Sequence, residues 1–217
     1  QRQAEVRDRI RTAPISRDLQ GFEVHTLGMF VNAVSPSPVG TWTYGVEYYR
    51  DWVSSFSTSS TIQGPVGDDA TYDLLGIYVQ NEYQWHERVS TIIGGRFTYA
   101  HADANSVSDG GSPASTIAVD EEYTNFSGSG RLLVAAIPDH LNFFGGISQG
   151  FRAPNLMDLT SSLTFGAGTL QLGSPQLDPE QFVSYEIGVK ARDENWQADL
   201  AYFYTSIDDL VVRVPTS

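Results

Sequence analysis

The side chains that could do chemistry in this 217-residue chain are a few histidines and several acidic clusters, because the sequence contains no cysteine. The histidines are scattered along it, and none has the i, i+4 spacing beside a carboxylate that a zinc-binding helix needs: His25, His86, His101 and His140. Without cysteine there is no thiolate ligand, thiolate nucleophile or disulfide. We therefore expect no metal site and no cofactor.

The acidic clusters and the serines are the remaining candidates for chemistry. Asp68–Asp69, Asp120–Glu122 and Asp208–Asp209 could bind calcium through their oxygens, but they lack the D-x-D-x-D-G spacing, which favours solvated loop charge. Serine is abundant, yet no G-x-S-x-G nucleophile elbow occurs. The chain is therefore not expected to be an enzyme.

Composition indicates the class of fold that must carry these side chains. Aromatic residues make up 12% of the sequence and there are 20 glycines, which favours strands and turns over helices. The formal net charge is −13, which argues against a basic face for nucleic acid. We expect an all-β protein that does not bind DNA or RNA.

Alternation of apolar and polar residues with period two predicts eight strands. Each spans about ten to thirteen residues, close to the length that a tilted strand needs to cross a bilayer. The apolar faces fit either lipid or the core of a soluble sandwich, but three tryptophans near strand ends favour an interfacial girdle: Trp42, Trp85 and Trp196. The predicted strands cover residues 22–34, 41–52, 74–85, 89–100, 124–136, 141–152, 181–190 and 195–207.

The connections between these strands alternate between short and long. Short turns are predicted at 35–40, 86–88, 137–140 and 191–194, and long polar connections at 53–73, 101–123 and 153–180. Three long loops on one side of a compact soluble domain would be unusual. The asymmetry is typical of antiparallel up-and-down transmembrane β-barrels, which have short periplasmic turns and long extracellular loops.

The stretch SQGFRAPNLMDL, followed by GSPQLDPE and SYEIGVK, resembles the barrel of TonB-dependent outer-membrane receptors. In that family a GFRAP-type strand end is followed by N-P-x-L-x-P-E and Y-E-x-G-x-K, and Ser174 stands here where asparagine is usual. A weaker resemblance to earlier strands of the family is found in YGVEYYRD, YVQNEY and GGRFTY. The matching motif residues are Gly150, Phe151, Arg152, Ala153, Pro154, Pro175, Leu177, Pro179, Glu180, Tyr185, Glu186 and Gly188.

The resemblance implies a barrel of about 22 strands, of which this chain supplies about eight. The family's signal peptide, plug domain, energy-coupling box and C-terminal strands are not recognisable here. Residues 1–217 are therefore expected to be an internal fragment of the barrel, in the outer membrane of a Gram-negative-type bacterium. The implied partners are outer-membrane lipid, a small-molecule ligand and, through a missing N-terminal region, the inner-membrane protein TonB.

The resemblance also implies a function, the energy-coupled uptake of a scarce ligand, with a ferric siderophore as the commonest substrate. Inward-facing Tyr78, Arg96, Arg131 and Arg152 would suit an anionic chelate, although Arg152 could instead pin the root of a loop. The resemblance makes haem less expected, because the family's haem receptors carry a histidine in the loop between the FRAP and NPNL motifs, and residues 155–173 contain none. The rival interpretation is a soluble or surface β-sandwich that binds carbohydrate or protein.

Overall fold

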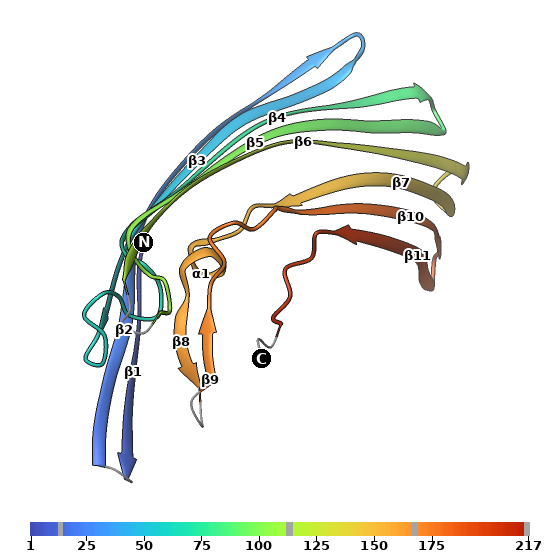
Figure 1. The fold of residues 1–217 in the computed structure, drawn as a ribbon. Helices are drawn as coiled ribbons and strands as arrows, with labels where there is room; N and C mark the ends of the chain where they lie inside the picture. The colour runs from blue at the N-terminus through green and yellow to red at the C-terminus, as the bar shows by residue number, and fades with distance from the viewer. Residues whose placement is uncertain (13–14, 112–114, 166–168, 215–217) are drawn as a thin grey trace.

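The computed structural model describes residues 1–12, 15–111, 115–165 and 169–214. Their main feature is one antiparallel sheet of nine strands, which forms an open curved wall (Figure 1). Its spatial order follows the chain, apart from an excursion between β7 and β10. The strands are β1 (Arg2–Thr12), β2 (Ile15–Ser37), β3 (Gly40–Ser57), β4 (Asp68–His86), β5 (Val89–Ser108), β6 (Thr116–Ile137), β7 (Leu141–Arg152), β10 (Glu180–Asp193) and β11 (Trp196–Asp208).

The two ends of the wall differ in the way that the sequence predicts. Tight turns join β2 to β3, β4 to β5, β6 to β7 and β10 to β11 at one end, and the longer connections lie at the other (Figure 1). Trp42, Trp85 and Trp196 are exposed side chains beside the tight turns. Tryptophan at this level is typical of the membrane–water interface of a barrel.

The wall has an apolar outer face and a more polar inner face. Val46, Ile77 and Phe97 are register partners on neighbouring strands of the outer face, where Val46 and Ile77 are 45% and 46% exposed. Within the described residues the other sheet is the small hairpin of β8 (Ser162–Phe165) and β9 (Thr169–Leu172), so no second sheet covers this apolar surface. The β-sandwich interpretation is therefore wrong, and the all-β barrel fold is confirmed.

The observed strands exceed the predicted ones in number and length. β1 went unrecognised because its outer face mixes charged with apolar residues, with Asp8 between Val6 and Ile10, although its other face is polar throughout. β3 to β6 also run further towards the long connections, so the predicted loops 53–73 and 101–123 shrink to 58–67 and 109–115. The extensions are rich in Ser, Thr, Ala and Asp, residues whose presence suggested loops although the backbone remains paired.

The excursion between β7 and β10 folds back onto the inner face of the wall. It contains β8, β9 and the short helix α1 (Leu156–Thr160), and Figure 1 shows them on the concave side. Leu156 and Leu159 pack there with small residues of the wall such as Ala102 and Ala104, forming a buried cluster completed by Val53, Val66, Ala70, Val107 and Val119. We call residues 153–165 and 169–179 the rim cap. In the described part of the chain, no helix is long and apolar enough to cross a membrane.

Candidate functional site

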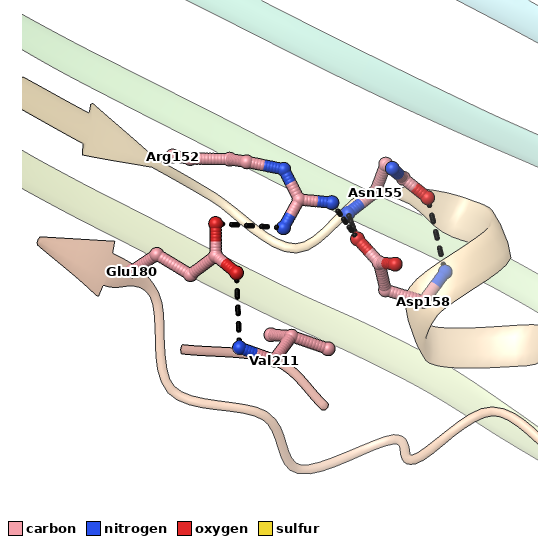
Figure 2. A network of polar contacts seen from close by, with 5 residues as sticks. All are labelled: Arg152, Asn155, Asp158, Glu180 and Val211. Carbon is pink, nitrogen blue, oxygen red and sulfur yellow. Dashed lines mark hydrogen bonds and ion pairs between the residues drawn. The ribbon is translucent and has the colours of Figure 1, made fainter. Parts of the chain in front are cut away.

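Arg152 is the last residue of β7, and its side chain lies between two carboxylates where the rim cap begins (Figure 2). Its guanidinium lies 2.6 Å from Oδ2 of Asp158 in α1 and 3.0 Å from Oε2 of Glu180, its register partner on β10. Glu180 is buried, and its Oε1 accepts a hydrogen bond of 2.9 Å from the backbone N–H of Val211. One ionic network therefore joins the end of β7, α1, the start of β10 and the segment after β11.

Pro154 and Asn155 direct the chain from the strand into this network. Pro154 lacks an N–H for strand pairing and is fully buried, which ends β7 and starts the cap. The Asn155 side chain accepts from the N–H of Asp158 at 3.0 Å, and the Asp158 carboxylate accepts from the N–H of Asn155 at 3.1 Å. This reciprocal capping box begins α1. Asp158 therefore serves both the helix and Arg152.

Two buried polar side chains fix the cap to the wall. Gln63, in the β3–β4 connection, donates to the carbonyl of Thr160 at 2.8 Å and accepts from the N–H of Ser108 at 2.6 Å. The Thr160 hydroxyl accepts from the N–H of Gly67 at 2.8 Å. Because these groups are buried, leaving any of them unpaired would cost free energy. The rim cap is thus a packed part of the fold.

Lower on the inner wall, Tyr78 and Arg96 are register partners on β4 and β5. Arg96 forms an ion pair with Glu47 of β3 and reaches it by lying over Gly76, where the Cβ of any other residue would collide with the guanidinium. Tyr78 lies over Gly45 in a similar way. Glycine on the neighbouring strand therefore lets a long side chain lie flat on the wall.

Replacing Gly76 with alanine should displace the Arg96 guanidinium and break its pair with Glu47. Since both side chains are partly exposed, we expect the midpoint of thermal unfolding to fall by only about 2 °C. Gly95→Ala is the matched control, because its Cβ would meet no atom within 4 Å. Equal melting of the two variants in the full-length protein would contradict the cradle assigned to Gly76.

A second ion pair crosses the wall from β6 to β10, 3.1 Å between Arg131 and Glu186. It lies in a hollow of about 370 Å³ on the inner face of β6, β7, β10 and β11. Arg131 is the register partner of Ile92 on β5, and Ile92 lies four residues from Arg96. Arg131 and Arg96 are therefore separated by roughly 13 Å along the strand direction. Arg152 stands apart at the rim, so the four residues predicted to bind ligand do not form one cluster.

The rim network should weaken in acid. The N–H of Val211 and the Arg152 guanidinium lower the pKa of the Glu180 carboxyl, although burial opposes them. A lowered pKa stabilises the fold above the unfolded value of about 4.3, and the stabilisation is lost as the pH falls through the folded value. We expect protection against hydrogen exchange in residues 155–161 to hold at pH 5 and decline below about pH 4.3. A Glu180→Gln variant with an identical pH profile would contradict this assignment.

The other motif residues also occupy structural positions. Leu177 packs against the buried cluster, and its carbonyl accepts from the Tyr123 hydroxyl at 3.2 Å. Tyr185 is 50% exposed on the outer face, and Gly188 lies beneath the Phe144 ring. Glu186 pairs with Arg131 across β7. Sequence reasoning missed Asn155, Asp158, Gln63, Thr160 and Val211; the N-x-x-D spacing after Pro154 was the available signal for the first two.

Long strands, an apolar outer face with tryptophans at one end, and a polar inner wall define a segment of a transmembrane β-barrel. Residues 7–217 match the family model for the TonB dependent receptor-like β-barrel. The chain therefore belongs to the TonB-dependent receptor family, whose members are transport receptors of the outer membrane.

Solved structures show the same wall. The copper transporter OprC aligns with a TM-score of 0.77 and 16% identity over 96% of this chain and 35% of its own. The hemophore receptor HasR of Serratia marcescens aligns with a TM-score of 0.71 and 16% identity over 89% of this chain and 34% of its own. The ferric yersiniabactin uptake receptor FyuA from Yersinia pestis aligns with a TM-score of 0.60 and 15% identity over 90% of this chain and 30% of its own.

Identities this low establish the fold alone. The chain spans about a third of the length of these structures. The sequence has no significant match among curated proteins.

Proposed function

We propose that this chain is part of the wall of an energy-coupled outer-membrane receptor that takes up a scarce ligand, with a ferric siderophore as the expected ligand. The main support is a spanning wall with a polar inner face and a rim cap fixed over it, in a chain of the TonB-dependent receptor family. TonB is the proposed energy-coupling partner, through a part of the full-length protein outside these residues. The proposed location is the outer membrane.

The fixed rim cap favours uptake over passive diffusion. An open pore needs an unobstructed lumen, whereas here the rim cap folds inward and is fixed by the Arg152 network and by Gln63. The rim cap narrows the space beside the inner face, so a solute that moves along this wall must pass the cap. Narrowing suits a receptor that selects its ligand before transport.

Uptake of radioactive iron by living cells tests the proposal. Iron-limited cells carrying the full-length gene should accumulate ferric chelate, and deletion of this gene or of the gene for TonB should abolish that accumulation. Complementation with the intact gene should restore it. Siderophore uptake would be refuted if cells with and without the gene accumulated iron at the same rate from every ferric chelate supplied.

A further inference from the structure

The three arginines that the sequence predicts as ligand contacts are paired with carboxylates of the same chain. Arg96 pairs with Glu47, Arg131 with Glu186, and Arg152 with both Asp158 and Glu180. An anionic ligand beside such a pair is attracted by the guanidinium and repelled by the carboxylate at a similar distance, so the two interactions largely cancel. These arginines therefore offer an anionic ligand little net attraction.

We propose that the ligand passing this wall is an electrically neutral ferric chelate with hydrogen-bonding groups, rather than the anionic chelate expected from the arginines alone. This inference rests on the proposed uptake function and deepens it. It concerns the hollow between β6 and β11 and the ion pair within it. Ferric iron bound by three hydroxamates is neutral, whereas ferric iron bound by three catecholates keeps negative charge.

The hollow has the polarity that a neutral ligand requires. Its volume of about 370 Å³ lies within the range of about 300–1,000 Å³ typical of small-molecule sites. Among the described residues that line it, Arg131 and Glu186 carry charge and cancel each other. A chelate entering it would meet no net charge, so hydrogen bonding and shape would decide binding.

A row of hydroxyl groups crosses the hollow. The residues are register partners on four adjacent strands: Ser129 of β6, Ser148 of β7, Ser184 of β10 and Thr205 of β11. Ser184 and Thr205 lie 2.9 Å apart through their hydroxyl oxygens. Each hydroxyl can donate or accept, so the row can serve the amide and hydroxamate groups of a neutral chelate.

Phe203 supplies an apolar surface beside that row. It is register partner to Glu186, hence on the inner face, and it is 73% exposed there. A large exposed aromatic ring on a polar wall can cover the methylene arms of a chelate. Hydroxyls, a cancelled ion pair and one aromatic ring together match a neutral ligand with apolar arms.

Binding of two ferric chelates to the full-length protein in detergent tests the inference by calorimetry. The probes are ferrichrome, a neutral ferric trihydroxamate, and ferric enterobactin, an anionic ferric tricatecholate. We expect the wild-type protein to bind ferrichrome at least about 100-fold more tightly. Glu186→Gln keeps the side-chain shape but leaves the Arg131 charge uncancelled, so affinity for the anionic chelate should rise about tenfold.

The controls separate the possible failures. Glu87→Gln, in an exposed turn outside the hollow, should change neither affinity, and Glu186→Gln should alter ferrichrome binding less than about threefold. Tighter wild-type binding of the anionic chelate would overturn the inference and leave uptake intact. Binding of neither chelate would also overturn it, and gene-independent iron accumulation would then show that the proposed function itself has failed.

Discussion

Leu159→Ala is expected to release the rim cap from the wall. Leu159 is fully buried at the centre of the cluster that joins α1 to β5 and β6, and its truncation leaves a cavity there. Such changes cost about 2–5 kcal/mol. Hydrogen exchange in residues 155–179 should therefore accelerate by roughly 30-fold or more, while the β4–β5 hairpin exchanges as in the wild type.

The matched control is Leu210→Ala, which removes the same atoms from a leucine that is 53% exposed. We expect its cap to exchange at the wild-type rate, because little apolar surface is lost. If Leu159→Ala left the cap as protected as Leu210→Ala does, the cap would have to be held by its polar contacts alone.

Arg152→Gln is expected to have the second largest effect, through the charges that it leaves behind. The Glu180 side chain is 7% exposed and Asp158 is 19% exposed, so both carboxylates would lose their cation in a partly dehydrated place. We expect the cap to be destabilised by about 1–3 kcal/mol. Faster exchange at Asn155–Thr160 and at the start of β10 would report it.

A second substitution distinguishes lost attraction from uncompensated charge. Adding Glu180→Gln to Arg152→Gln should cost less than the two single changes together, because the buried carboxylate is then gone. Arg2→Gln is the control for an exposed ion pair, with Arg2 68% exposed beside Glu23, and should leave the cap unaffected. Additive effects of the two rim changes would show that Arg152 and Glu180 act independently.

The wall could be predicted from the sequence because period-two alternation is local. Residues such as Val46, Ile77 and Ile187 repeat on one face of each strand, so fold class, outer face and membrane girdle followed without knowledge of the partner strands. β1 escaped because its outer face carries Asp8 beside Val6 and Ile10. Mixed faces of that kind give no periodic signal.

The rim cap could not be predicted, because long-range contacts hold it. The sequence offered two roles for Arg152, ligand contact and loop anchor, and the structure places it on Asp158 and Glu180. No local pattern shows that Gln63 meets Thr160. The sequence predicts that Arg96 faces inward, but its carboxylate partner Glu47 lies two strands away on β3, and no local pattern connects the two.

The bond between Gln63 and Thr160 also bears on the order in which the receptor is assembled. The two residues are 97 positions apart, and β4 to β7 lie between them along the chain. Bringing such distant positions together carries a loop-closure cost that falls once the intervening strands have paired. The Glu180–Val211 bond adds the requirement that β11 be in place. We therefore expect the rim cap to close only after β4 to β11 have paired, so that a wall with unpaired strands would lack its cap.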